Sequence, residues 1–109
     1  MPTIISGKNF KLSPTLQDYV TQELRKLEKF SSQIISSKAE LDHDHNQHTG
    51  KVYRVELSVR LPGIVLMAGQ KAEHMRTAIE QCLKKLERQV TKYKDKQTDR
   101  SRRSAKKFA

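Results

Sequence analysis

The sequence predicts an α+β domain with the element order β-α-β-β-β-α, in which two helices pack on one face of a four-stranded sheet. Apolar residues repeat every three or four positions in two segments, as on one face of a helix. They repeat every second position in two other segments, as in half-buried strands. The length of 109 residues suits one thin core rather than two domains.

The chain is predicted to begin with a short strand at Thr3–Gly7, a β-branched run that closes on glycine. A helix should follow, because Ser13 is a favoured cap and Pro14 suits the first helical position. The apolar stripe of this helix consists of Leu12, Leu16, Val20, Leu24 and Leu27, with Tyr19 and Phe30 at its margins.

Three strands are predicted next. The first has one face made of Ile35, Ser37, Ala39 and Leu41, and a polar loop is expected from Asp42 to Gly50. The second strand shows the clearest alternation, with Tyr53, Val55, Leu57, Val59 and Leu61 on one face. Pro62 and Gly63 form a two-residue turn into the apolar run 64–68, so the last two strands should form an antiparallel hairpin.

The spacing becomes helical again after Gly69. A helix of about 20 residues is predicted to pack on the sheet through one apolar face, made of Met75, Ile79, Cys82, Leu83, Leu86, Val90 and Tyr93. Apolar positions stop near Gln97, and we expect residues 98–109 to be a basic tail that is disordered when alone. The chain therefore divides into a domain of residues 1–97 and a tail of residues 98–109.

The net charge is +10, from 22 Lys and Arg against 12 Asp and Glu. Such an imbalance in a short chain points to a polyanionic partner, either nucleic acid or an anionic membrane surface. The charge is segregated, because the basic residues of the last helix occupy one arc and its glutamates another. The candidate phosphate-binding residues on the two helices are Arg25, Lys26, Lys29, Lys84, Lys85, Arg88, Lys92 and Lys96.

The alternative without a binding function is that these cations form a solvated helix face that keeps the protein soluble. Segregation and net charge favour phosphate contact, which releases counterions and discriminates sequence weakly. The two helices, packed side by side, would present both basic faces to the same partner. Stacking on single-stranded bases is disfavoured, because Tyr19, Phe30 and Tyr93 are assigned to apolar faces.

Other chemistry is not supported. The single cysteine, Cys82, lies on an apolar face and cannot form an internal disulfide, and His74 has no partners for a catalytic triad. The tract with His43, His45 and His48 resembles a metal site but is more typical of a solvated loop. We therefore expect no enzyme activity, cofactor, metal or small-molecule substrate. Because no apolar stretch approaches about 18 residues and no secretory signal is visible, we expect a cytosolic location without membrane contact.

Several segments resemble one bacterial family. They are 26–29, 68–69 and 73–79, and above all Lys85–Lys96, while 5–7 and 13–14 also align. Together they resemble the family of ribosome hibernation promoting factor and ribosome-associated inhibitor, also called the sigma-54 modulation protein family. The resemblance covers roughly residues 1–96. The chain departs from the family pattern at His74, where an acid is usual, and at Arg76, where an aromatic residue is common.

The resemblance implies a non-enzymatic factor that enters the small ribosomal subunit in stationary phase or stress. It would lie between head and body in the path of tRNA and mRNA, and hold the ribosome inactive. The ribosome-binding part would be the domain of residues 1–97. Positions that match the family's rRNA-facing residues are Lys26, Lys29, Lys85, Arg88, Lys92 and Lys96.

Two other functions stay open. The older family name suggests a protein-interaction regulator that modulates a sigma factor. A generic double-stranded RNA module would have a similar arrangement of layers but the order α-β-β-β-α, without the leading strand. The chain resembles the short forms of the family, some of which promote ribosome pairing while others oppose it. We expect a monomer off the ribosome.

Overall fold

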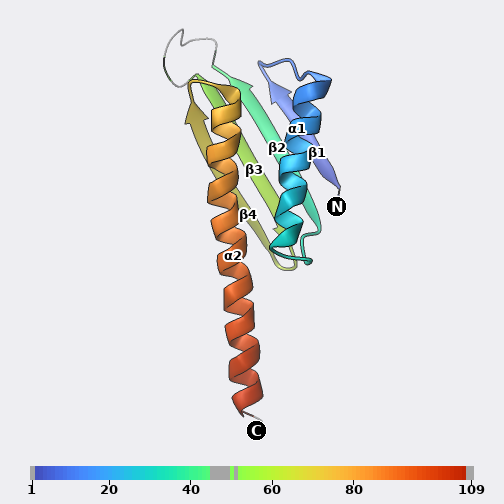
Figure 1. The fold of residues 1–109 in the computed structure, drawn as a ribbon, viewed down its shortest axis with the longest axis vertical. Helices are drawn as coiled ribbons and strands as arrows, with labels where there is room; N and C mark the ends of the chain where they lie inside the picture. Colours follow the sequence, from blue (N-terminus) through green and yellow to red (C-terminus); the bar gives the residue numbers. More distant parts are fainter. Residues whose placement is uncertain (1, 45–49, 51, 108–109) are drawn as a thin grey trace.

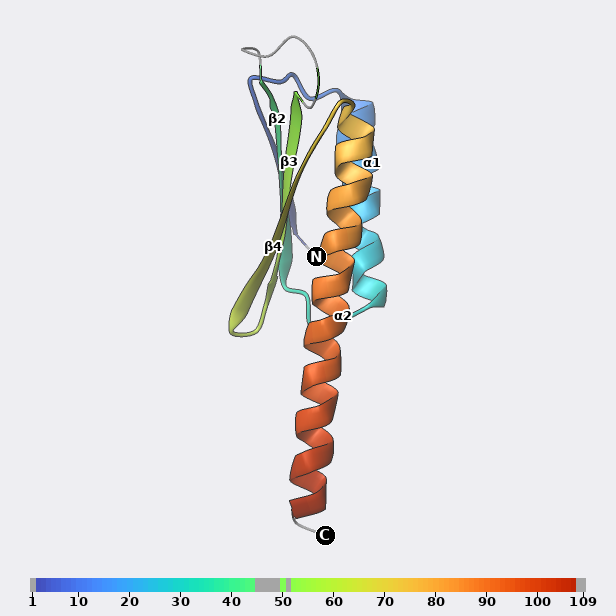
Figure 2. The same cartoon turned by 90° about the vertical axis from the view of Figure 1, so that its left-hand side faces the viewer.

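The computed structural model describes residues 2–44, 50 and 52–107, with residues 97–107 described by their backbone alone. The elements follow the predicted order and form one sheet with the strand order β1-β2-β3-β4. Both helices cover the same face of this sheet (Figure 1 and Figure 2). The elements are β1 (Thr3–Lys8), α1 (Pro14–Arg25), the 3₁₀ turn η1 (Lys26–Lys29), β2 (Ser36–His43), β3 (Tyr53–Leu61), β4 (Ile64–Ala72) and α2 (Met75–Lys107).

The sheet is mixed. β1 pairs with β2 in parallel, with Thr3 opposite Ser37, so the chain must cross over through α1 to join them. A hydrogen bond of 3.0 Å between the two hydroxyl groups supports this register. The pairs β2–β3 and β3–β4 are antiparallel, and Leu61 lies opposite Ile64 across the predicted two-residue turn. Gly63 adopts φ of 77° in that turn, a conformation that glycine tolerates without strain.

The start of α1 confirms the predicted cap. Ser13 is extended, and its Oγ accepts a 3.1 Å hydrogen bond from the backbone N–H of Leu16, while Pro14 occupies the first turn. After Arg25 the helix tightens into η1, which ends at Lys29. Two of the predicted phosphate-binding lysines, Lys26 and Lys29, therefore lie in a 3₁₀ turn rather than in an α-helix.

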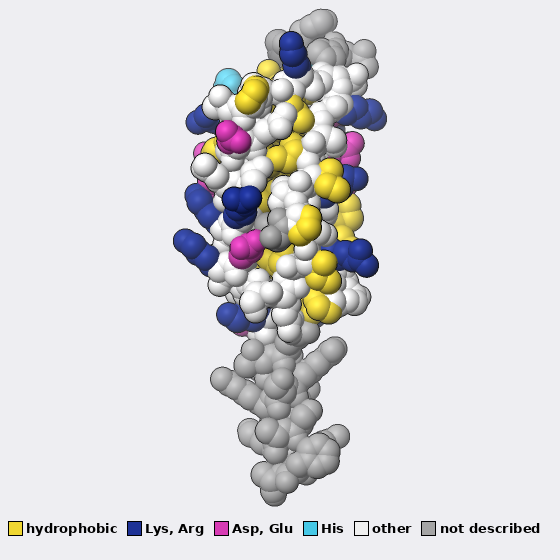
Figure 3. Space-filling view, turned by 90° about the vertical axis from the view of Figure 1, so that its right-hand side faces the viewer, with side chains coloured by type: hydrophobic (Ala, Val, Ile, Leu, Met, Phe, Trp, Pro, Cys, Tyr) yellow, Lys and Arg dark blue, Asp and Glu magenta, His cyan; other side chains and the backbone are white. Residues whose placement is uncertain are grey.

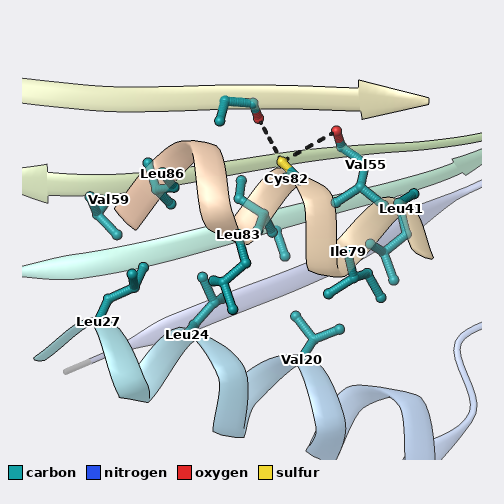
Figure 4. Packing of buried hydrophobic residues seen from close by; sticks show 14 of the residues in the cluster. Val20, Leu24, Leu27, Leu41, Val55, Val59, Ile79, Cys82, Leu83 and Leu86 are labelled. Atoms are coloured by element: carbon teal, nitrogen blue, oxygen red, sulfur yellow. Dashed lines mark hydrogen bonds between the residues drawn. The ribbon is translucent and has the colours of Figure 1, made fainter. Parts of the chain in front are cut away.

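The core lies between the helices and the sheet, as the two periodicities predict (Figure 4). Val20 and Leu24 of α1 are fully buried, as are Leu86 of α2 and Val55 of β3. Burial of one such side chain stabilises the fold by about 2 kcal/mol. Cys82 belongs to this core, and its Sγ lies 3.1 Å from the carbonyl oxygen of Ala68.

The prediction for the beginning of β2 was wrong at one residue. Ile35 is 48% exposed, and Ile34 is buried in its place. The chain leaves a turn just before β2 begins at Ser36, so the strand alternation does not extend back to Ile35. At the other end β2 continues to His43, so it includes Asp42 and His43, the first two residues of the predicted loop.

The end of α2 also differs from the sequence prediction. The backbone of residues 98–107 continues the helix to Lys107, where a disordered tail was expected. No glycine or proline follows Gly69, so the sequence contains no strong signal to stop the helix. The last part of α2 projects beyond the end of the sheet (Figure 1). The predicted boundary at residue 97 therefore falls inside a continuous helix.

Candidate nucleic-acid interface

All eight predicted phosphate-binding side chains are exposed, and they form two groups. The α1 patch consists of Arg25, Lys26 and Lys29, at the end of α1 and in η1. The α2 stripe consists of Lys84, Lys85, Arg88, Lys92 and Lys96. The stripe is exposed because the opposite face of α2 is packed in the core through Ile79, Leu86 and Val90. The structure therefore leaves both groups accessible to a ligand.

Contacts on the two sides of α2 fix the direction of the stripe. Lys85 donates a 3.1 Å hydrogen bond from Nζ to the carbonyl oxygen of Gly69 in β4. On the other side, the guanidinium carbon of Arg76 lies 5.0 Å from the centre of the Tyr19 ring in α1. The α2 stripe therefore faces solvent and the β4 edge, and it points away from α1.

Carboxylates lie between the two basic groups. Lys26 Nζ is 2.7 Å from Glu23 Oε1, and this hydrogen bond and charge raise the pKa of Lys26, with a smaller contribution from Glu87 of α2. Burial raises the pKa of Tyr19, and the charges of Glu23 and Glu80 add to this effect. The α1 patch and the α2 stripe are thus separate basic surfaces, and the zone between them contains Glu23, Glu80 and Glu87 together with Arg76.

Sequence reasoning missed a basic groove at the edge of the sheet. A hollow of about 560 Å³ lies between the end of β4 and the first turns of α2, and Lys71, Lys84, Lys85 and Arg88 line it. Figure 2 faces this edge and shows β4 and α2 diverging from their connection. Lys71 was missed because it is an isolated cation at the end of a strand. Its relation to the stripe depends on how α2 packs.

Other exposed cations lie outside both groups. Viewed from the side of β1 and α1, apolar side chains form a column down the molecule, and Lys and Arg side chains flank it on both sides (Figure 3). Lys11, Lys38 and Arg60 are exposed and belong to neither helix. Charge reversal at these three positions is therefore a control for charge reversal at the basic residues of the helices.

The structure shows the surroundings of the cysteine and of one histidine that were considered as reactive or metal-binding groups. Cys82 is buried, and burial raises the pKa of its thiol to about 11, so the thiol is protonated at neutral pH. His43 stacks on Tyr53 with ring centres 4.7 Å apart. His45 and His48 lie outside the described residues. Among the residues that are described, no three His, Cys, Asp or Glu side chains are arranged to hold a metal ion.

Within the described part of the chain, no helix combines the length and the apolar character that crossing a bilayer requires.

Comparison with protein families matches residues 3–98 to the family described as "Sigma 54 modulation protein / S30EA ribosomal protein". The chain belongs to this family. The resemblance found in the sequence is thereby confirmed. Because the match extends from residue 3 to residue 98, it covers every residue of the α1 patch and the α2 stripe.

Relatives within the sigma 54 modulation and S30EA family include proteins of two lengths. The chain is 28% identical over 90 residues to a ribosome hibernation promotion factor of Deinococcus radiodurans, aligning with 83% of this chain and 47% of that protein. It is 30% identical over 104 residues to a ribosome hibernation promoting factor of Acinetobacter guillouiae, covering 91% of this chain and 92% of that protein. The chain thus spans about half the length of some curated relatives and nearly all of others.

Solved structures show the same fold. The N-terminal domain of Thermus thermophilus Protein Y superposes with a TM-score of 0.75 at 24% identity, over 85% of this chain and 99% of that chain. A ribosomal subunit interface protein from Coxiella burnetii gives a TM-score of 0.76 at 22% identity, over 87% of this chain and 99% of that chain. Two solved structures with less than a quarter of their residues identical to this chain therefore share its fold.

Arg76 connects the two helices. Its guanidinium carbon lies 5.0 Å from the centre of the Tyr19 ring. A cation over an aromatic face contributes about 0.5–1 kcal/mol at exposed sites. Arg76 therefore contributes a contact between α1 and the start of α2.

Proposed function

We propose that this protein is a ribosome-associated hibernation factor that binds rRNA of the small subunit and inhibits translation in stress or stationary phase. The observation that carries the proposal is the α2 stripe, five exposed cations on one side of a helix whose other side is buried. The names of the relatives, ribosome hibernation promoting factors, support the same function. A cytoplasmic location and the absence of enzyme activity follow from this proposal.

The chemistry of binding is phosphate contact. Each Lys or Arg that neutralises a phosphate releases a counterion, so affinity falls steeply with salt. Aromatic rings near the stripe are few, and Tyr93 is partly buried against the core and donates a hydrogen bond from its OH to Pro62 O at 3.4 Å. Specificity would therefore come from the shape of folded rRNA rather than from base stacking. The path of tRNA and mRNA on the small subunit is such a folded surface.

The decisive test is co-sedimentation with ribosomes on a sucrose gradient. The variant Lys85→Glu/Arg88→Glu/Lys92→Glu should lose binding, because it reverses three charges of the stripe. The control Lys11→Glu/Lys38→Glu/Arg60→Glu makes the same change in net charge at exposed positions outside the helices. Equal binding by both variants would contradict the proposal.

The proposed position on the subunit has its own test. Occupation of the tRNA and mRNA path predicts weaker inhibition when initiator tRNA and message are bound before the protein is added. Inhibition of translation should be compared for preloaded and empty ribosomes at the same protein concentration. Equal inhibition in both cases would place the protein elsewhere.

A second candidate function is modulation of a sigma factor, which the family description names. Such a regulator would act through protein contacts and would not travel with the small subunit at moderate salt. The same gradient therefore separates the two functions. A generic double-stranded RNA module is less consistent with the structure, because β1 precedes α1 and joins the sheet.

A further inference from the structure

The basic groove at the β4 edge continues beyond α2 onto the sheet. A second hollow of about 540 Å³ adjoins it and is also lined by Lys71 and Lys85. This second hollow adds Arg54 of β3, which lies directly opposite Lys71 in the strand register. The two hollows thus form one path from the α2 stripe, past Lys71, to the open face of the sheet.

The residues that line this path are mainly positive, and Arg54 at its far end also pairs with Glu56, with 3.8 Å between Nη2 and Oε2. Lys71, Lys84, Lys85 and Arg88 line the first hollow, and among its described lining residues Glu73 is the sole acid. A concave surface lined by one sign of charge concentrates the electrostatic potential and attracts the opposite charge. The zone between α1 and α2, in contrast, contains carboxylates. An anion approaching α2 is therefore favoured on the β4 side.

Lys85 is held at the junction of the two hollows. Its Nζ donates one hydrogen bond to the carbonyl oxygen of Gly69, at 3.1 Å. A lysine ammonium group has three N–H donors, so this bond still leaves donors for a ligand. The bond to Gly69 also restricts the side chain before binding, which lowers the entropy lost when an anion is bound.

The lining favours a phosphate backbone over an acidic peptide. Neutral donors, the side chains of Gln70, Gln81 and Thr77, accompany the cations. Ala72 is the apolar member of the described lining residues, so the groove offers little to an apolar anchor of a peptide. The described lining residues include no Phe, Tyr or Trp, and the imidazole of His74 is their one aromatic ring, so bases have few surfaces for stacking. Contacts of this kind bind phosphates without reading bases.

We propose that the groove between β4 and α2 binds the phosphate backbone of one RNA strand, and that Lys71 and Arg54 extend the contact from the α2 stripe onto the sheet. This inference rests on the proposed function, because it assumes that the stripe contacts RNA. It adds two residues from the sheet to a surface that the sequence assigned to helices alone.

The test uses the full chain with Lys71→Glu and, as matched control, Lys38→Glu on the open face of the sheet. Both lysines are exposed strand residues with the same charge. Affinity for small subunits is measured between about 50 and 200 mM salt, where phosphate contacts are sensitive. Lys71→Glu should lower the affinity several-fold and reduce the log–log salt slope by about 0.7–0.9. Lys38→Glu should match the wild type.

A second experiment tests which kind of polyanion the groove binds. NMR amide shifts at Gln70, Lys71 and Thr77 are followed while single-stranded poly(U) or poly-glutamate of equal charge is added. Shifts with RNA that are lost in Lys71→Glu, and are absent with poly-glutamate, support the proposal. Equal shifts with both polymers would overturn it, because the groove would then bind any polyanion or acidic peptide.

The variants also separate this inference from the proposed function. If Lys71→Glu binds with the wild-type salt slope while the triple variant of the α2 stripe loses binding, the inference is wrong and the proposed function stands. If the triple variant also binds normally, the proposed function fails first. Thermal unfolding of Lys71→Glu, followed by circular dichroism, verifies that the exposed substitution leaves the fold intact.

Discussion

The side-chain amide of Gln89 in α2 donates a 2.7 Å hydrogen bond to the carbonyl oxygen of Met67 in β4. Two positions along the strand, the carbonyl of Gly69 accepts the bond from Lys85. β4 is an edge strand, and every second residue of such a strand directs its backbone groups away from its neighbour. Side chains of α2 therefore cover part of an edge that another strand could otherwise use.

The first prediction is that removing these bonds promotes self-association. The variant Lys85→Ala/Gln89→Ala removes both side chains that cover the edge of β4. The same strand also exposes two apolar side chains, Val65 (54% exposed) and Met67 (52% exposed). Exposed apolar edge strands pair with other chains. Light scattering after gel filtration should show a monomer for the wild type and concentration-dependent dimers for the variant. A monomeric variant at every concentration would show that other features block the edge.

The second prediction concerns Gly7, where space rather than φ requires glycine. A Cβ at this position would lie against the carbonyl oxygen of Phe10, well inside van der Waals contact. Gly7→Ala should therefore lower the free energy of unfolding by about 1–3 kcal/mol, measured by urea denaturation. Gly69→Ala is the matched control, because its Cβ would meet Val55 O at an ordinary 3.8 Å. Equal losses in both variants would exclude the steric cause.

The third prediction follows from the buried thiol. Burial raises the pKa of Cys82 from 9.0 to about 11. Between these values the unfolded chain releases the thiol proton while the folded protein keeps it, so the free energy of unfolding falls as pH rises. Cys82→Ala should show a smaller fall between pH 9 and 11 in parallel urea titrations. If the free energy of unfolding falls equally with pH in the wild type and in Cys82→Ala, the thiol does not contribute to this pH dependence.

The fourth prediction concerns residues 98–109. The part of α2 that extends beyond the sheet carries five cations, Arg100, Arg102, Arg103, Lys106 and Lys107. Truncation after Gln97 should leave the melting temperature nearly unchanged, because this part of α2 projects beyond the sheet (Figure 1). It should weaken ribosome affinity several-fold and make the salt dependence shallower, because phosphate contacts are lost. Unchanged affinity would make the segment a passive extension.

Much of the fold was predictable because local patterns agreed with the final packing. The alternation from Val55 to Leu61 placed β3, and the turn at Pro62 and Gly63 placed the hairpin. Ser13 marked the start of α1, as its hydrogen bond to Leu16 confirms. In each case, residues close in sequence carry the signal, so no knowledge of distant contacts is needed.

The site was less predictable because it depends on distant contacts. The exposure of the α2 stripe follows from helical spacing, but its direction does not. That direction is set by Arg76 against Tyr19 and by Lys85 against Gly69, pairs that are far apart in the sequence. The contribution of Lys71 to the groove has the same origin. The separation of the two basic groups by Glu80 and Glu87 also appears first in the packed structure.

The parallel pairing of β1 with β2 has a consequence for the order in which the protein folds. Thr3 and Ser37 lie 34 positions apart, whereas Leu61 and Ile64 are joined by a two-residue turn. Loop closure costs more entropy as the loop lengthens, so the hairpin can form before β1 finds its partner. During synthesis, β1 leaves the ribosome first but must wait until β2 has emerged. The first strand to be synthesised is therefore a late addition to the sheet.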